Sequence, residues 1–319
     1  MIEAVVVGRV GVDLTPAAPN TSLARGESFT RAVGGFAGNI GTGLARLGIA
    51  TAVVSAVGDD GHGDHVRTFL AGEGIDVSAI APIAGSRTQV AFFEVWPPDR
   101  FPVTFYRSTP APETRLSAAD LPADILAAPV VVLSGALLAT EPARSTVFAI
   151  LEGRQRSRDR EAVFITLFDL DWRPTMWEDP AEAPSLTERA ARMSDIVVGS
   201  DEEFAATRMR PRIDAGAEPA SIVLKHGPAG VSLVTENGQR TIPGIDVDVL
   251  CGTGAGDALT AAFVAGLLRG LDPLVAVERG NAAGAIVATR LMCSTAMPTP
   301  DEIDRMLESR SVEPQGARP

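Results

Sequence analysis

Short apolar runs alternate with helical segments along most of this chain. Runs of this kind, most of them ending in polar residues, occur at residues 4–8, 51–57, 130–133, 162–168, 196–199 and 222–227. Continuous apolar runs of this length are typical of strands that are buried on both faces. Helices between such strands favour right-handed βαβ units. The sequence therefore predicts an α/β fold with a mostly parallel central sheet.

The composition supports a single large domain over residues 1–319. Hydrophobic residues make up 45% of the chain and aromatic residues only 5%, so that Ala, Val, Leu and Ile supply the apolar core. The net charge of −12 argues against a nucleic-acid partner, because a phosphate backbone selects basic surfaces. No apolar run reaches 18 residues and no basic leader precedes the first strand. We therefore expect no membrane partner and a cytoplasmic location.

Two segments do not follow the alternation of apolar runs and helical segments. Residues 12–33 and 87–107 are polar or alternate in polarity, which is typical of exposed β-ribbons and hairpins. Together they predict a small sheet that forms a lid over a site. Tyr106 and Arg107 lie where the second ribbon ends, and we expect them to close over a substrate. Residues 309–319 are polar and contain Pro and Gly, so we expect a disordered tail.

A glycine-rich turn precedes the longest uncharged helix. Residues 251–257 read Cys-Gly-Thr-Gly-Ala-Gly-Asp, and no charge follows until Arg269. Free N–H groups at a helix N-terminus attract anions, and Asp257 lies in the first turn. A carboxylate beside an anion site indicates proton acceptance, so the turn predicts phosphoryl transfer to a hydroxyl with Asp257 as base. A helix N-terminus would keep this a weak base, which phosphoryl transfer tolerates. A plain tight turn with an acidic residue is the alternative.

A second glycine pair precedes another helix. Gly34 and Gly35 permit close approach of the backbone to a ligand, and Asn39 follows in the first turn. An amide that both donates and accepts hydrogen bonds suits a polyol, although Asn39 could equally only cap the helix. Asp13 follows the first strand, at the edge where open α/β sheets bind ligands.

Other charged residues gather at later strand ends. Asp169 and Asp171 form a pair that would suit glycoside hydrolysis, but Arg173 favours a charged network that grips an anionic substrate. A strand-end salt bridge is an equal alternative. Glu203 could help to hold hydrated Mg²⁺, or be an ordinary acidic residue of a first helical turn. Lys225 could neutralise a nucleotide phosphate, or be solvated.

Histidine and cysteine offer little further chemistry. His62 and His65 flank Asp64, but no third ligand joins them, so loop and helix-cap roles are favoured over a metal site. Cys251 and Cys293 form neither a disulfide framework nor a metal motif.

At this point the chain resembles the ribokinase, or PfkB, family of carbohydrate kinases. The resemblance rests on Gly34-Gly35-x-x-x-Asn39 and Gly254-Ala255-Gly256-Asp257, on their separation, on the βα rhythm and on the split lid. It covers nearly the whole chain. It implies a ribokinase-like three-layer α/β/α fold with a small β-sheet lid, ATP as phosphate donor, Mg²⁺, and a sugar as acceptor.

The family pattern also implies roles for individual residues. Gly254, Ala255 and Gly256 would form the anion hole and Asp257 the base. The acceptor would be held by Asp13, Gly34, Gly35 and Asn39, and beyond the family motifs by Tyr106, Arg107, Asp169, Asp171 and Arg173. Lys225, Gly227, Thr253 and Asn281 would bind the nucleotide, with Asn281 near adenine, and Glu203 would serve the metal. A homodimer through the lid is expected by analogy.

Within the family, the chain is most similar to kinases of acidic sugars. Residues 8–14, 168–177, 225–227 and 290–298 resemble the kinases that phosphorylate 5-dehydro-2-deoxygluconate in inositol catabolism, and Arg107 and Arg173 suit a carboxylate. The alternatives are 2-keto-3-deoxygluconate, fructose, ribose or a nucleoside as acceptor, and a non-catalytic sugar-binding regulator. Cys251-Gly252 replaces the family's Asp-Thr, so we expect no potassium requirement. The dinucleotide fingerprint of oxidoreductases is missing after the first strand.

Overall fold

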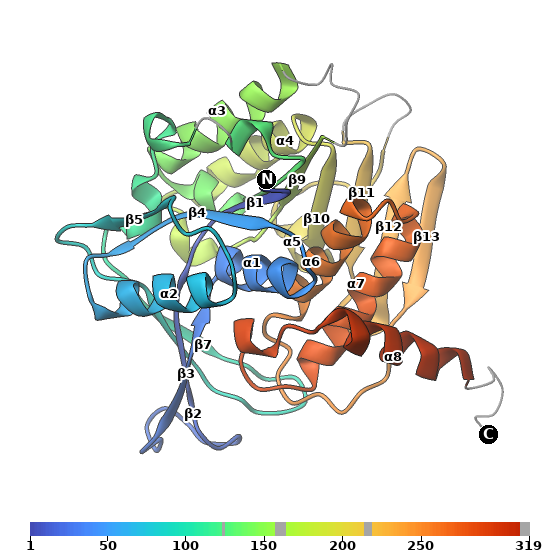
Figure 1. Cartoon of the computed structure of the whole chain (residues 1–319), viewed down its shortest axis with the longest axis horizontal. Coiled ribbons are helices and arrows are strands. Elements are labelled where there is room, and N and C mark those ends of the chain that lie inside the picture. The colour runs from blue at the N-terminus through green and yellow to red at the C-terminus, as the bar shows by residue number, and fades with distance from the viewer. Residues whose placement is uncertain (123–124, 157–163, 214–218, 313–319) are drawn as a thin grey trace.

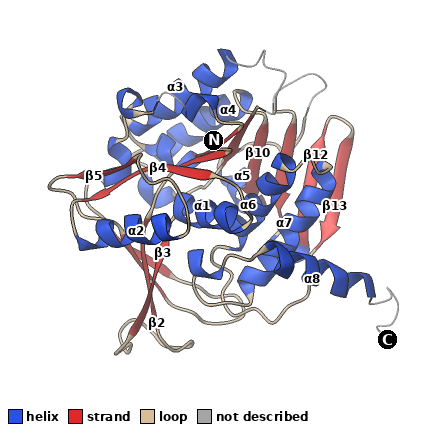
Figure 2. Cartoon of the chain, in the orientation of Figure 1, coloured by secondary structure: helices blue, strands red, loops and turns tan. Residues whose placement is uncertain are grey.

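Nine strands form one central sheet in the order β13-β12-β11-β10-β9-β8-β1-β4-β5. The computed structural model describes residues 1–122, 125–156, 164–213 and 219–312, and helices cover both faces of this sheet (Figure 1, Figure 2). Every pairing from β5 across to β11 is parallel, whereas β12 and β13 are antiparallel at one edge. The predicted mostly parallel α/β sheet is confirmed.

The strands of the central sheet are short. They are β1 (Ala4–Val7), β4 (Thr51–Gly58), β5 (Ile80–Ile83), β8 (Val130–Ser134), β9 (Ile165–Asp169), β10 (Ile196–Ser200), β11 (Ser221–Lys225), β12 (Gly230–Thr235) and β13 (Gly238–Pro243). The antiparallel hairpin β12-β13 was not predicted from the sequence. It carries no helix between its strands and so interrupts the βα rhythm.

A separate four-stranded sheet forms the lid, as expected. Its strands are β2 (Gly11–Pro16), β3 (Phe29–Gly34), β6 (Val90–Phe93) and β7 (Val103–Tyr106), in the order β3-β2-β6-β7. The pairs β2-β3 and β6-β7 are antiparallel, and β2 and β6 join the two ribbons in parallel. The lid projects from the body of the molecule (Figure 1).

Two helical layers enclose the central sheet because its residues alternate between two hydrophobic clusters. The helices are α1 (Phe36–Arg46), α2 (Gly61–Gly72), α3 (Ala143–Arg156), α4 (Ala183–Arg192), α5 (Asp201–Ala206), α6 (Ala255–Leu268), α7 (Pro273–Ala288) and α8 (Pro300–Val312). In β1, Val6 packs in the cluster that contains Ile40 of α1 and Phe263 of α6, whereas Val7 packs with Ile150 of α3. This alternation produces the expected three layers.

Two boundaries differ from the expectation. Helix α8 continues to Val312, so residues 309–312 of the expected tail are helical, and residues 313–319 lie outside the described residues. Of the apolar run 162–168, residues 162 and 163 lie outside the described residues, and strand β9 begins at Ile165. Among the described residues, no helix combines the length and apolar character that a membrane span requires.

Candidate active site

A cavity of about 470 Å³ lies between the carboxyl ends of the central strands and the lid. Arg9, two residues beyond β1, and Asp169, the last residue of β9, line this cavity, and the lid contributes Val103 and Phe105. Most of the residues predicted for the site line this one cavity. These are Asp13, Gly35, Asn39, Asp169, Asp171, Arg173, Glu203, Lys225, Thr253, Gly254, Gly256 and Asp257.

The N-terminus of α6 opens on this cavity. Gly254 precedes the helix with φ 88°, and no side chain caps the helix there. A Cβ at Gly254 would lie 2.9 Å from the Cβ of Cys293, so both the backbone angle and the space favour glycine. An uncapped helix N-terminus presents unpaired N–H groups that suit a phosphate.

Asp257 lies in the first turn of α6 and meets Asn39 from α1. The Nδ2 of Asn39 donates to Oδ2 of Asp257 at 2.7 Å. Burial raises the pKa of Asp257 above its ordinary value, although the Asn39 amide acts in the opposite direction. Burial therefore acts on Asp257 against the effect expected of a helix N-terminus, and the expectation of a weak base stays a prediction. The tertiary environment moves Asp257 toward the pKa of a useful general base.

Asp13, on the lid strand β2, lies beside the two glycines of the first motif. A Cβ at Gly34 would lie 1.9 Å from Oδ2 of Asp13, and one at Gly35 would lie 2.7 Å from the Arg9 carbonyl oxygen. Gly34 therefore requires glycine because of the Asp13 carboxylate, whereas Gly35 requires it because of the Arg9 backbone and a φ of 85°. Burial raises the pKa of Asp13 to about 7, against the lowering effects of the Cys293 thiol and of Arg9.

Asp171 forms the centre of a buried charge cluster. Arg9 donates through Nη2 to Oδ1 and Oδ2 of Asp171 at 3.1 and 3.0 Å, and Arg173 approaches Oδ1 at 3.0 Å. The Ser134 hydroxyl donates to Oδ2 at 2.6 Å. Burial acts to raise the pKa of Asp171, but the two guanidinium groups and Ser134 outweigh it, so the pKa is lowered. The cluster shows the strand-end salt bridge that was one interpretation of these residues, and the grip on an anionic substrate stays a prediction.

Lys225 and Asp169 form a second buried pair. Nζ of Lys225 lies 3.2 Å from Oδ2 of Asp169 and 4.0 Å from Oε2 of Glu203. Burial acts to lower the pKa of Lys225, but the two carboxylates outweigh it and raise the pKa. Lys225 therefore remains cationic beside the N-terminus of α6, where a Cβ at Gly256 would lie 3.5 Å from its Nζ.

Glu203 serves local structure as well as the cavity. Its Oε2 accepts from the backbone N–H of Ser200, whose hydroxyl accepts from the Glu203 N–H, which forms a capping box at α5. Its Oε1 accepts from the N–H of Trp172 at 3.0 Å. No group of three or more His, Cys, Asp or Glu side chains in the described residues could hold a metal by itself. The metal role of Glu203 stays a prediction.

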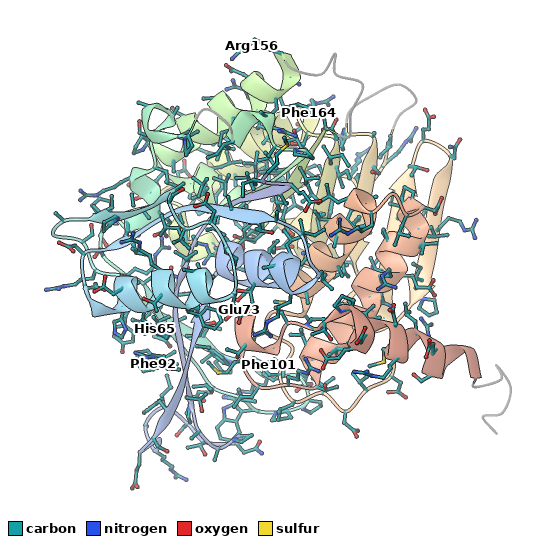
Figure 3. The ribbon with its side chains drawn as sticks, in the orientation of Figure 1. His65, Glu73, Phe92, Phe101, Arg156 and Phe164 are labelled. Atoms are coloured by element: carbon teal, nitrogen blue, oxygen red, sulfur yellow. The ribbon has the colours of Figure 1, made fainter. Side chains whose placement is uncertain are left out.

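Several predicted residues lie away from the cavity wall. Tyr106 is 63% exposed and packs edge-on against Phe92 of the lid. Figure 3 shows Phe92 on the lid side of α2. Arg107 pairs with Glu113 and borders a small adjoining cavity instead. Asn281 donates to the Pro243 carbonyl oxygen at 3.0 Å and so ties α7 to the end of β13.

The remaining assignments concern backbone positions. Gly34 lies against the carboxylate of Asp13, and Ala255 is the first residue of α6. Gly227 has φ 57° in the turn after β11, and the structure does not bring it to the cavity. Near the α6 turn, Phe101 of the lid lies 3.3 Å from the position of a Cβ at Gly252, so the lid reaches the glycine-rich segment. Figure 3 shows Phe101 on that side of the molecule.

Some cavity residues received no role from the sequence. Arg9 and Trp172 belong to segments that resemble the family, but neither was assigned a function, and Gln89 of the lid was missed. Cys293 lines the cavity, and burial raises its thiol pKa well above the ordinary value. An arginine directly after a buried strand is a signal that could have identified Arg9.

Comparison with known proteins assigns the family. Residues 1–300 match the model of the pfkB family carbohydrate kinases. A 5-dehydro-2-deoxygluconokinase of Clostridium tetani is 33% identical, covering 98% of this chain and 94% of its own. The 5-dehydro-2-deoxygluconokinase of Geobacillus thermodenitrificans is 32% identical, with 96% and 93% covered.

Solved structures agree with this assignment. An uncharacterized sugar kinase from Pyrococcus horikoshii, solved in complex with ATP, superposes with a TM-score of 0.80 at 25% identity. The superposition covers 97% of this chain and 100% of the other. The ribokinase-like fold is thus confirmed, and the chain belongs to the pfkB family of carbohydrate kinases and is a sugar kinase.

Proposed function

We propose that this kinase transfers the γ-phosphate of ATP to a hydroxyl of an acidic sugar, with 5-dehydro-2-deoxygluconate as the first candidate. The observation that carries the proposal is the cavity itself, which joins Asp257 and the uncapped α6 N-terminus to Arg9 and Arg173. The first two features serve phosphoryl transfer, and the guanidinium groups suit an acceptor with a carboxylate. The names of the two relatives support the same acceptor.

In this proposal, Asp257 accepts the proton of the acceptor hydroxyl during phosphoryl transfer. The Asn39 amide orients the carboxylate through its 2.7 Å hydrogen bond, and the raised pKa improves proton acceptance. The N–H groups of the Gly254–Gly256 turn stabilise charge that develops on the transferred group. Alignment and electrostatics do most of the work because the transition state is loose.

The acceptor would be held from α1 and the lid. The Oδ1 of Asn39 is buried and has no hydrogen-bond partner among the described residues. It is therefore free to accept from a substrate hydroxyl while Nδ2 holds Asp257. Asp13, with a pKa of about 7, can donate or accept at neutral pH, which suits a second hydroxyl. Gly34 and Gly35 give both groups their space.

The nucleotide would bind on the other side of the α6 turn. Lys225 supplies a positive charge for its phosphates, and Thr253 offers polar contacts at the cavity wall. The P. horikoshii kinase solved with ATP supports ATP as donor. Gly227 and Asn281 stay predictions for the adenine side. Mg²⁺ would be held by the nucleotide phosphates with Glu203 as an outer partner, and it would neutralise phosphate charge.

We also propose a homodimer that forms through the lid, and a cytoplasmic location. Phe29, Val103 and Tyr106 are large apolar side chains of the lid with exposed fractions of 38%, 42% and 63%. Phe92 links two of them through edge-on contacts with Phe29 and Tyr106. Exposed aromatic groups of this kind favour burial against a second copy.

An acceptor screen tests the proposed reaction. Purified protein with ATP and Mg²⁺ is offered 5-dehydro-2-deoxygluconate, 2-keto-3-deoxygluconate, fructose, ribose and adenosine, and nucleotide consumption is measured. We expect a clear preference for the two acids, with the larger kcat/KM for 5-dehydro-2-deoxygluconate. Preference for a neutral acceptor would contradict the acidic-sugar assignment. Binding of ATP without turnover on any acceptor would favour a non-catalytic sugar-binding regulator.

A further inference from the structure

Arg9 is the most deeply buried cationic side chain of the cavity. It is 4% exposed, yet it lines the cavity and also the small one beside it. Its Nη2 is committed to Asp171, but its Nε is buried and has no hydrogen-bond partner in the described part of the chain. A buried donor without a partner is costly, so the guanidinium of Arg9 has hydrogen-bonding capacity that the described part of the chain does not use.

The charge balance around Asp171 supports the same conclusion. Arg9 and Arg173 both contact this carboxylate, so two positive charges face one negative charge. Ser134 adds a neutral hydroxyl. Asp13 also lies near Arg9, but burial raises its pKa to about 7, so it supplies less than a full negative charge at neutral pH. Glu203, Asp257 and Asp169 also act on Arg173 across the cavity, whereas Arg9 makes no ion pair except the one with Asp171 in the described part of the chain.

Another arginine near the cavity, Arg107, already has a counterion. Arg107 forms an ion pair with Glu113, a side chain that is 1% exposed. The Nε of Arg107 is also buried without a hydrogen-bond partner in the described residues, but Arg107 lines the small adjoining cavity and not the large one, and its pair with Glu113 carries no excess charge. Arg173 is the outer member of the Asp171 cluster, because 43% of its side chain is exposed. Arg9 is therefore the more buried of the two cations, and its ion pair with Asp171 holds it in place.

We propose that Arg9, with Arg173 across Asp171, forms the subsite that binds the carboxylate of the acceptor. In this arrangement Asp171 holds Nη2 of Arg9, and the remaining N–H groups of the guanidinium donate to the substrate carboxylate. A guanidinium with one edge fixed loses little freedom on binding, which favours selectivity. The inference rests on the proposed acidic-sugar acceptor, and it names the residue that distinguishes acids from neutral sugars.

The test compares one acid with its uncharged form. We propose to measure kcat and KM for 5-dehydro-2-deoxygluconate and for its methyl ester with the wild type, Arg9→Gln and Arg9→Lys. For the acid, we expect Arg9→Gln to lower kcat/KM about 100-fold, mainly through KM, because a buried charge-assisted contact is lost. For the ester, the change should stay within about 3-fold. Arg9→Lys should recover only part of the loss, because an ammonium lacks the planar fork.

A second variant separates recognition from folding. Arg9→Gln alone removes one of the two guanidinium partners of Asp171 and could destabilise the chain, so Arg9→Gln/Asp171→Asn removes both charges together. This double variant leaves Arg173 without its ion pair, but 43% of that side chain is exposed to solvent, so the variant should unfold at nearly the wild-type temperature and still lose its preference for the acid. Arg192→Gln is the matched control, since Arg192 pairs with Glu188 on the surface at 2.7 Å. It should leave both acceptors unaffected.

The possible failures are distinguishable. If the wild type uses acid and ester equally well, the acidic-sugar proposal fails and this inference fails with it. If the wild type prefers the acid and Arg9→Gln keeps that preference, only the inference is overturned. An equal loss for acid and ester would also overturn it, because it would show that Arg9 acts through the general shape of the cavity.

Discussion

Asp257 and Asn39 form a hydrogen bond of 2.7 Å although 218 residues separate them in the sequence. The contact gives the carboxylate a fixed direction, and burial raises its pKa. Neither property follows from the position of Asp257 at a helix N-terminus. At the scale of single residues, the chemistry therefore depends on which groups two distant helices bring together.

The first prediction concerns Asp257 as the base. Asp257→Asn keeps the size of the side chain but removes proton acceptance, so kcat should fall by roughly 10²–10⁴ with little change in the unfolding temperature. Steady-state turnover and thermal unfolding check this. Asp272→Asn is the matched control, because Asp272 caps α7 and asparagine caps equally well. Near-normal turnover of Asp257→Asn would remove the base assignment.

The second prediction concerns the pH dependence of stability at Asp13. The pKa of Asp13 is about 7 in the folded chain, whereas its ordinary value, which applies to the unfolded chain, is 3.8. The folded state therefore binds this proton more tightly. The contribution to stability is complete below pH 3.8 and is lost as the pH rises through 7, by up to about 1.4 kcal/mol per pH unit.

Removing the charge at Asp13 should therefore help most at high pH. Asp13→Asn should have the larger free energy of unfolding at pH 8, and its advantage over the wild type should shrink toward pH 5. Denaturant titrations of both proteins at several pH values measure this difference. A pH-independent difference would show that Asp13 is ionised throughout the range.

At the scale of elements, the turn before α6 combines a backbone requirement with a packing requirement. Gly254 has φ 88°, and Cys293 leaves no room for a Cβ. Gly254→Ala should lower the free energy of unfolding by about 1–2 kcal/mol and reduce phosphoryl transfer, because the N-terminus of α6 must shift. Denaturant unfolding and turnover check the two effects.

A second glycine variant provides the control for this element. Gly72 ends α2, and a Cβ there would meet no atom within 4 Å. Gly72→Ala should leave stability equal or slightly higher, because alanine favours the helix. If Gly254→Ala were as stable as Gly72→Ala, the turn would not need its left-handed residue.

At the scale of the whole molecule, the proposed lid interface predicts a dimer. The wild type should sediment as a dimer at micromolar concentration, and Tyr106→Glu should shift it toward monomer, because a charge would be buried in the interface. Leu271→Glu is the matched control, since Leu271 is also an exposed apolar residue, at 36%, but follows α6 outside the lid. A wild-type monomer, or a dimer unchanged by Tyr106→Glu, would contradict the lid interface.

Much of this architecture could be predicted because it depends on local patterns. Apolar runs buried on both faces and the helices between them identify β1, β4, β8, β10 and β11 and the layers around them. The β12-β13 hairpin was not predicted because it breaks the βα alternation, although its strands belong to the same sheet. The α8 boundary differed because polar residues at a helix end resemble a tail.

The sequence alone determined the fold class, the lid and the family, since these follow from periodicity and from two glycine motifs whose backbone angles few other residues adopt. Only the tertiary structure decided which charges meet. Arg9 and Asp171, 162 residues apart, form a buried pair, whereas Arg107 turns to Glu113. The physical reason is that burial and pairing depend on distances between elements, and local sequence carries no measure of those distances.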